Sequence, residues 1–157
     1  SRIRKHTCAR SNTRKVVPLI FPSEWYEELL RHASFGPLRL GMSEASVIEI
    51  FGAPDYEGFP GKKKRIVAFD TKHLQVTFHN GRVVHFGLYF HHCDEPKQLS
   101  GIQLSETKPV EDLGNWTRER GIGWSESSMS TDCLHLRLDN GVVAVFEDRR
   151  LSSLQVA

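Results

Sequence analysis

The run from His91 to Glu95 reads His-His-Cys-Asp-Glu and contains five side chains that can each bind a metal ion. Neighbouring residues of a regular strand point to opposite faces, so His91 and His92 do not easily chelate one ion together. A metal site here needs further ligands from elsewhere in the chain. Because Pro96 follows, we expect the run to begin a loop. A metal-assisted hydrolase or nuclease is therefore an alternative function and not the favoured one.

Other catalytic motifs are missing from the sequence. No serine stands in a Gly-x-Ser-x-Gly motif, and the chain has neither of the common glycine-rich nucleotide-binding motifs. A nucleophile needs an oriented base beside it, and Cys93 is the one cysteine that stands directly between a histidine and an acidic residue. Cys133 begins an apolar stretch and is expected to pack. The sequence predicts no catalytic residue, no cofactor and no bound metal, and hence a protein that is not an enzyme.

Two segments concentrate positive charge. Six of the 21 Lys and Arg residues lie in the first fifteen positions, at Arg2, Arg4, Lys5, Arg10, Arg14 and Lys15. The second segment is the run from Lys62 to Arg65, close to Phe59. Either segment could contact phosphates, which makes a nucleic-acid-associated module a second alternative. A formal net charge of +2 does not by itself indicate such a partner, and we expect residues 1–15 to be a flexible arm.

Capping and turn residues divide the rest of the chain into elements. They predict helices over residues 23–35, 43–51 and 109–121, the second capped by Ser43. Residues 16–21 contain a proline and are expected to form an edge strand or an extended segment. Residues 58–64 are expected to form a polar loop. Strands follow over residues 65–69, 73–78 and 82–90, and a short strand over residues 122–124.

Two hairpins match without a gap at an offset of sixty positions, residues 74–86 against residues 134–146. Both have Asn-Gly at the turn, the dipeptide that best suits a tight hairpin. We therefore expect residues 16–157 to be one soluble α+β domain with two pseudo-repeats, at about 36–95 and 103–157. The fold class is a tandem repeat of a helix plus an antiparallel β-hairpin, forming one antiparallel sheet covered by helices on one face.

Strand alternation divides the hairpin residues between two faces. The core-facing set is Leu74, Val76, Phe78, Val84, Phe86, Leu88, Leu134, Leu136 and Leu138. The opposite phase leaves one outward face rich in histidine, tyrosine and arginine, residue types that are common or enriched at protein interfaces. The candidate partner-binding residues on it are His73, Gln75, Thr77, His85, Tyr89, His135 and Arg137.

Three cysteines, Cys8, Cys93 and Cys133, cannot all pair, and their spacing is typical of neither a disulfide framework nor a zinc site. The number and spacing of the cysteines therefore favour a protein of a reducing compartment. No apolar run approaches the roughly 20 residues of a membrane-spanning helix, and the first residues lack the apolar segment of a secretory signal. We therefore expect a cytoplasmic protein without membrane contact. The sequence does not indicate an oligomeric state.

Residues 35–55 contain a Gly-Met-Ser turn, a helix with a central valine, and a Phe-Gly-Ala-Pro ending. This pattern resembles the small lipoproteins of the outer-membrane barrel-assembly machine and the β-lactamase inhibitory proteins. The resemblance implies tandem repeats of helices on antiparallel strands, and a non-catalytic protein that grips other proteins, as the inhibitor does with the concave face of its sheet. The chain shows no lipid-attachment cysteine behind a signal and no evident pair of disulfides.

A duplicated cytosolic version of this fold is similar to bacterial immunity proteins. By that analogy we expect a bacterial immunity or inhibitor protein that binds and neutralises a cognate toxin or enzyme.

Overall fold

The structure, a computed structural model, describes residues 21–69, 73–90, 98–99, 102–105 and 108–157. These ranges contain helices α1 (Ser23–His32), α2 (Glu44–Phe51) and α3 (Pro109–Glu119). One eight-stranded antiparallel sheet contains β1 (Tyr56–Gly61), β2 (Lys64–Phe69), β3 (Leu74–His79), β4 (Arg82–Tyr89), β7 (Trp124–Ser130), β8 (Cys133–Leu138), β9 (Val142–Glu147) and β10 (Arg150–Val156). A separate two-stranded hairpin contains β5 (Gln98–Leu99) and β6 (Ile102–Gln103). The α+β class and the antiparallel sheet are as the sequence predicts.

The large sheet has the strand order β1-β2-β3-β4-β10-β9-β8-β7. Strands β1 to β4 form one antiparallel meander, and β7 to β10 form a second. The two meanders join through their last strands, because Leu88 of β4 pairs with Leu154 of β10. The centre of the sheet is therefore built from residues that lie far apart in the sequence.

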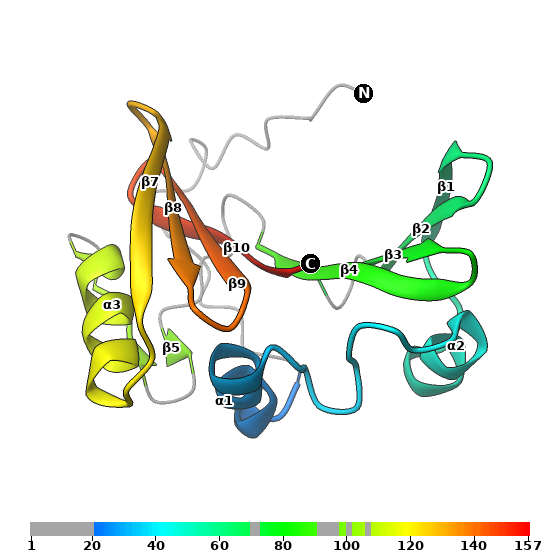
Figure 1. Ribbon diagram of the computed structural model, residues 1–157, viewed down its shortest axis with the longest axis horizontal. Helices are drawn as coiled ribbons and strands as arrows, with labels where there is room; N and C mark the ends of the chain where they lie inside the picture. The colour runs from blue at the N-terminus through cyan, green and yellow to red at the C-terminus, as the bar shows by residue number, and fades with distance from the viewer. Residues whose placement is uncertain (1–20, 70–72, 91–97, 100–101, 106–107) are drawn as a thin grey trace, which may run out of the picture.

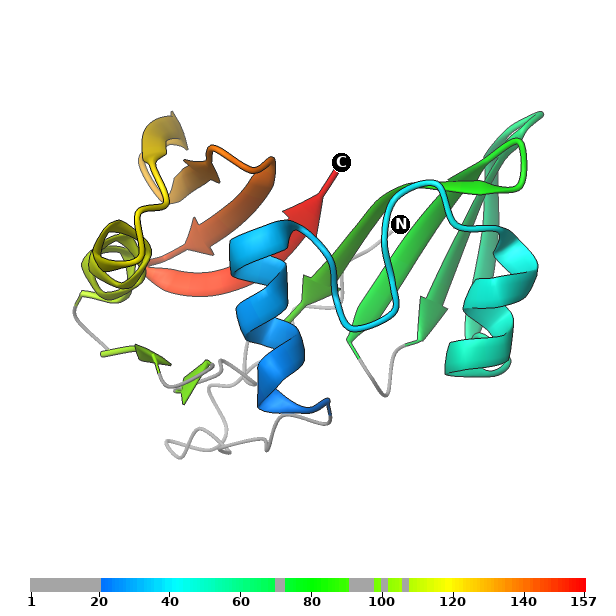
Figure 2. The same ribbon diagram turned by 60° about the horizontal axis from the view of Figure 1, so that its bottom comes forward.

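All three helices lie on the same side of the sheet (Figures 1 and 2). Helix α2 lies at the β1–β4 end, α1 near the middle and α3 at the β7 end. The two ends of the sheet rise away from the helices in Figure 1, so the helix-free side is concave. Below, we call this helix-free side the open face.

Local chemistry explains where helix α2 begins and ends. The Ser43 side chain accepts a hydrogen bond from the Ser46 backbone N–H at 3.2 Å, which satisfies one of the free donors of the first turn. At the other end, Gly52 has a φ of 85° and donates its N–H to the Ile48 carbonyl. Both boundaries confirm the helix predicted over residues 43–51.

Gly36 lies in the tight turn that follows helix α1. Its φ is 56°, and a Cβ built on it would lie 2.4 Å from the Trp25 ring. The indole therefore packs directly over the glycine, where any side chain would collide with it. Trp25 also makes an edge-to-face contact with Phe35 at 5.4 Å between ring centroids. This cluster anchors α1 to the loop that leads into α2.

The core lies between the helices and the sheet. It is formed mainly by buried aliphatic and aromatic side chains from both meanders and from α1, α2 and α3, among them Leu29, Leu30, Phe35, Val47, Val67, Phe69, Val76, Phe78, Phe86, Leu113, Leu136, Ala144, Phe146 and Leu154. Residues of β3 alternate between this core and the open face, as the period of two requires.

Val84 lies on the face opposite to the one predicted. Thr77 pairs with His85 and Phe78 pairs with Val83, so Val84 is one extra residue on β4. Such a bulge shifts the alternation by one position. Val83 is consequently 2% exposed and Val84 41% exposed. The prediction that Val84 faces the core is wrong.

The two Asn-Gly turns have different conformations. Asn80 and Gly81 have φ values of 52° and 74°, the pattern of a two-residue hairpin turn. In the second hairpin only Gly141 has a positive φ, at 95°. There the Asn140 side chain donates to the Leu30 carbonyl of α1 at 2.7 Å and accepts from the Val142 N–H at 3.1 Å. Asn140 therefore ties the β8–β9 loop to a helix distant in sequence.

Two strands of the large sheet were not predicted from the sequence, nor were the short strands β5 and β6, and β7 (Trp124–Ser130) shares only Trp124 with the strand predicted over residues 122–124. Residues 58–64 were expected to form a polar loop, but β1 covers Tyr56–Gly61 and pairs with β2. Strand β10 was not predicted, although it lies at the centre of the sheet. The arm at residues 1–15 and most of the extended segment at residues 16–21 lie outside the described residues. No helix in the described ranges is long and apolar enough to span a membrane.

Candidate binding face of the sheet

The strand register places six of the seven predicted face residues in the phase opposite to the core. Gln75 pairs with Gly87 and Thr77 with His85 on β3 and β4. On β8, His135 and Arg137 stand one position before and after the buried Leu136. Tyr89 completes the set at the end of β4. These side chains come from strands in both halves of the sheet and share its open face.

A single row of paired residues crosses the open face from one edge of the sheet to the other. From β7 to β1 it contains Ser125, Arg137, Val143, Gln155, Gly87, Gln75, Ala68 and Tyr56. A shorter parallel row contains Ser127, His135, Val145, Ser153 and Tyr89. Polar and aromatic groups therefore recur across the face, interrupted by small and aliphatic residues, and Val145 and Ser153 in the shorter row are buried.

The centre of the face is formed around Gly87. A Cβ built on this glycine would lie 2.9 Å from the Tyr89 ring and 3.2 Å from the Gln155 side chain. Both side chains therefore lie over the glycine. Burial raises the pKa of the Tyr89 hydroxyl above its ordinary value of 10.0, because the charged form loses solvation. Tyr89 stays a neutral hydrogen-bonding group at neutral pH.

Gln155 is the central residue that the sequence analysis missed. Its Oε1 lies 3.0 Å from His85 Nε2, and its Nε2 donates to Ser153 Oγ at 2.9 Å. The amide therefore fixes the imidazole of a neighbouring strand. The alternation of Ser153 and Gln155 with the buried Leu154 and Val156 is the signal that could have revealed β10 as a half-buried strand.

His135 and Ser127 are direct cross-strand partners on β8 and β7. His135 Nδ1 and Ser127 Oγ are both shielded from solvent, and neither has a hydrogen-bond partner among the described residues. A buried polar atom left without a partner costs about 1 to 3 kcal/mol. The open face therefore carries hydrogen-bonding capacity that the described part of the chain does not use.

His73 is the predicted face residue that the structure places elsewhere. It lies in the turn before β3 with a φ of 58°, outside the regular alternation of the strand. Its carbonyl accepts the Tyr89 N–H at 2.8 Å. His73 thus supports the end of β4 through its backbone and does not belong to the row of face residues.

The family models, the curated proteins and the solved structures compared with this chain contain no match to it. The site is therefore interpreted from its own geometry.

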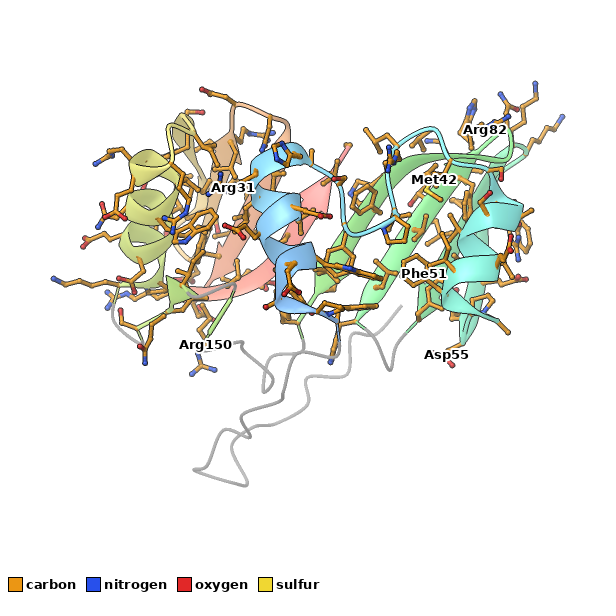
Figure 3. The ribbon with its side chains drawn as sticks, turned by 90° about the horizontal axis from the view of Figure 1, so that it is seen from below. Arg31, Met42, Phe51, Asp55, Arg82 and Arg150 are labelled. Atoms are coloured by element: carbon orange, nitrogen blue, oxygen red, sulfur yellow. The ribbon has the colours of Figure 1, made fainter. Side chains whose placement is uncertain are left out.

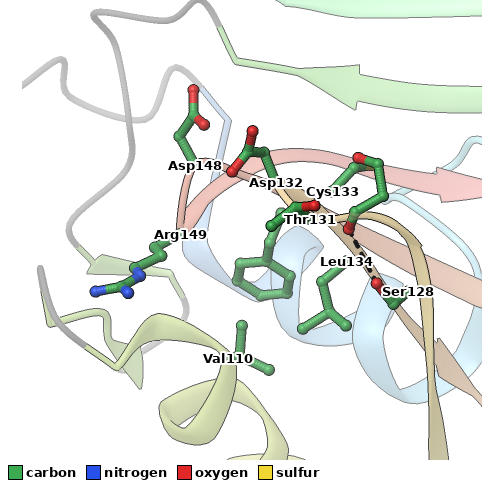
Figure 4. Close-up of a pocket in the computed structure, with 10 residues that line it drawn as sticks. Val110, Ser128, Thr131, Asp132, Cys133, Leu134, Asp148 and Arg149 are labelled. Atoms are coloured by element: carbon green, nitrogen blue, oxygen red, sulfur yellow. Dashed lines mark hydrogen bonds between the residues drawn. The ribbon is translucent and has the colours of Figure 1, made fainter.

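A separate cavity of about 530 Å³ lies at the other end of β8 (Figure 4). Val110, Leu134 and Phe146 supply apolar walls, and the turns around Asp132 and Asp148 form the rim. The lining contains the Cys133 thiol and two carboxylates but no histidine or lysine. A thiol nucleophile paired with a nitrogen base is therefore not assembled in this lining.

The candidate metal ligands from His91 to Glu95 lie outside the described residues, as do Cys8 and Cys93. Among the residues that the structure does describe, no group of three or more His, Cys, Asp or Glu side chains is arranged to hold a metal ion. Cys133 is a free thiol at the start of β8.

Proposed function

We propose that this chain is a non-catalytic protein that binds another protein through the open face of its sheet. The observation that carries the proposal is the row of side chains that crosses all eight strands on the side without helices. Its central residues, Tyr89, Gln155 and His85, are held by neighbours and present polar groups together with aromatic surface. Fixed aromatic and polar groups of this kind bind a partner at a low cost in conformational entropy.

The unpaired atoms of His135 and Ser127 are shielded from solvent, so a partner reaches them only when neighbouring side chains move aside. A donor or an acceptor supplied in that way would relieve the cost of leaving them unpaired. Arg137 lies beside them, exposed, and forms no ion pair among the described residues. Such a residue is free to pair with a carboxylate of the partner.

A tandem duplication is part of the proposal. Each four-stranded meander follows one helix, α2 before β1 and α3 before β7, and each helix is joined to its meander by four residues. The two meanders meet through equivalent last strands, as two related halves would do. The hairpins match at an offset of sixty positions, although their Asn-Gly turns differ in conformation.

The resemblance of residues 35–55 to barrel-assembly lipoproteins and β-lactamase inhibitory proteins suggests the kind of role. We infer a bacterial, cytoplasmic immunity or inhibitor protein that neutralises a toxin or an enzyme. Coverage of one side of the sheet by helices, with the concave side free for the partner, belongs to this inference.

The test is a binding measurement with the protein encoded beside this chain's gene. We expect a one-to-one complex by calorimetry, which Arg137→Ala weakens by about 2 kcal/mol, or roughly thirtyfold in Kd. The matched control is Arg31→Ala, because Arg31 is an exposed arginine of α1 on the helix side whose pairing with Glu27 contributes little. No complex, or equal weakening by both substitutions, would contradict the proposal.

A further inference from the structure

Large hydrophobic side chains are strongly exposed at one end of the molecule. Leu40, Ile50, Tyr56, Phe59 and Val84 are between 39% and 70% exposed, and the described residues after Val84 contain no comparable side chain. All five belong to α2, the loop before it, β1 or β4. Single exposed hydrophobics need no explanation, but five at one end of a small domain indicate a contact surface.

Two hairpin tips bring positive charge to the same end. The Asn80 N–H donates to the Lys63 carbonyl at 3.0 Å, which holds the β3–β4 turn beside the β1–β2 turn. Lys62, Lys63 and Lys64 are exposed on one tip, and Arg82 is exposed on the other. We call these four cations, together with Phe59 and Val84, the cationic tip. Figure 3 shows Arg82 at this end of the molecule.

The four cations of the cationic tip form no ion pair with any carboxylate among the described residues. The nearby Arg65, in contrast, pairs with both Glu44 and Glu57 on the helix side of the sheet. The two carboxylates beside Arg65 are therefore already used. Residues 56–69 and 73–90 carry five Lys or Arg and one Glu, whereas residues 124–156 carry three Arg and five Asp or Glu. The strands of the β1–β4 end thus carry an excess of positive charge, which Glu44, Glu49 and Asp55 of α2 and the loop after it partly offset.

We propose that the cationic tip is a second contact zone of the binding protein and docks on an acidic protein surface with an apolar centre. This inference rests on the proposed function, because it names the chemistry of the partner. Lysines around exposed aromatic and aliphatic groups match a carboxylate rim around an apolar patch.

A protein partner fits the cationic tip better than a nucleic acid does. Val84 is aliphatic, and aliphatic side chains bury against apolar protein surface but do not stack on bases. The guanidinium group of an arginine can bind a phosphate through two parallel hydrogen bonds, but that of Arg65 already pairs with two glutamates. Three of the four cations of the cationic tip, which form no ion pair among the described residues, are lysines. The free groups act as point charges, which steer an acidic partner into contact.

The test uses a random copolymer of glutamate and tyrosine as the acidic, partly apolar probe, and a 20-nucleotide oligothymidylate as the nucleic-acid probe. Each is titrated into isotope-labelled full-length protein at low salt while amide chemical shifts are followed. We expect the copolymer to change the amide chemical shifts of residues 56–64 and 80–84.

We expect the double variant Lys62→Glu/Lys63→Glu to weaken copolymer binding by about tenfold or more. The control is Lys108→Glu, at an exposed lysine beside α3, which should change copolymer binding by less than about twofold.

Three results would overturn the inference. These are copolymer binding that the double variant leaves unchanged, no copolymer binding at the tip, and tighter binding of oligothymidylate, which would assign the tip to nucleic acid. The variants change exposed turn residues, and an unchanged melting temperature verifies their folding. Copolymer binding at the cationic tip does not involve Arg137. A negative result in this experiment is therefore distinguishable from a failure of the open face to bind its protein partner.

Discussion

At the scale of single residues, the open face depends on one glycine. Gly87 has no side chain, and this lets Tyr89 and Gln155 lie over the backbone at the centre of the sheet. Aromatic side chains often cover strand glycines in this way. Tyr56 lies over Gly58 at the β1 edge in a similar arrangement, but with more space, since a Cβ on Gly58 would lie 3.5 Å from the ring.

The two glycines provide a matched test. Gly87→Ala places a methyl group 2.9 Å from the Tyr89 ring and 3.2 Å from the Leu154 carbonyl, so we expect a loss of about 1 to 3 kcal/mol in unfolding free energy. Gly58→Ala meets only ordinary contacts and should change stability by less than about 0.5 kcal/mol. Urea denaturation measures both. Equal effects of the two substitutions would show that the contacts over Gly87 are not tight.

Tyr26 gives the core a dependence on alkaline pH. It is 3% exposed. Burial raises its pKa from 10.0 to about 12, and a backbone hydrogen bond with Phe21 offsets part of this rise. Because the folded pKa lies above the unfolded one, the neutral phenol contributes stability that is complete below pH 10 and is lost as the pH rises to about 12.

We expect a decrease of up to about 3 kcal/mol in unfolding free energy between those two pH values that is attributable to Tyr26. In Tyr26→Phe this part of the decrease should be absent. Chemical denaturation at several pH values measures the difference between the two proteins. A decrease of the same size in both would show that Tyr26 is not the group responsible.

At the scale of elements, the turns show how far sequence reasoning reaches. Asn80-Gly81 signals its hairpin because both residues tolerate a positive φ. The β9–β10 turn adopts positive φ at Asp148 and Arg149, 49° and 63°, with no such signal in its residues. A turn of this kind is imposed by the pairing of Glu147 with Arg150 across the strands and not by local preference.

That difference predicts opposite effects of two substitutions. Arg149→Gly removes a side chain from a left-handed conformation and should raise the unfolding free energy by about 0.5 to 1 kcal/mol. Gly81→Ala adds a methyl group with nothing within 4 Å, so its cost of about 1 kcal/mol comes from the φ of 74° alone. Thermal unfolding measures both. A destabilising Arg149→Gly would show that the arginine side chain makes a contact worth more than the relief of backbone strain.

The helices and the two Asn-Gly hairpins were predictable, whereas strands β1 and β10 and single positions such as Val84 were not. Ser43 and Gly52 bound α2 through local hydrogen bonds that depend on neighbouring residues, so the sequence indicates them. The bulge at Val84 depends on how β3 and β4 pair, and the face assignment of that residue was therefore wrong. Strand β1 contains Pro60 and two glycines and looks like a loop until its pairing with β2 is known.

At the scale of the whole molecule, the arrangement of strands decides which residues form the site. Predicted residues Gln75, Thr77, His85 and Tyr89 come from one hairpin, and His135 and Arg137 from the other. What joins them is the pairing of β4 with β10 and of β10 with β9. The β4–β10 pairing is set by contacts between residues about seventy positions apart, such as His85 and Gln155. The local alternation around Gln155 indicates a strand but not that β10 pairs with β4, so the place of Gln155 on the face was not predictable.

The central claim about the molecule as a whole is that a partner protein covers the open face and leaves the helix side free. Hydroxyl-radical footprinting of the complex tests it directly, because the method reports the accessibility of side chains one by one. We predict that complex formation lowers the oxidation of Tyr89 and His135 and leaves that of Trp25, on α1, unchanged. Protection of Trp25 with no change at Tyr89 and His135 would contradict it.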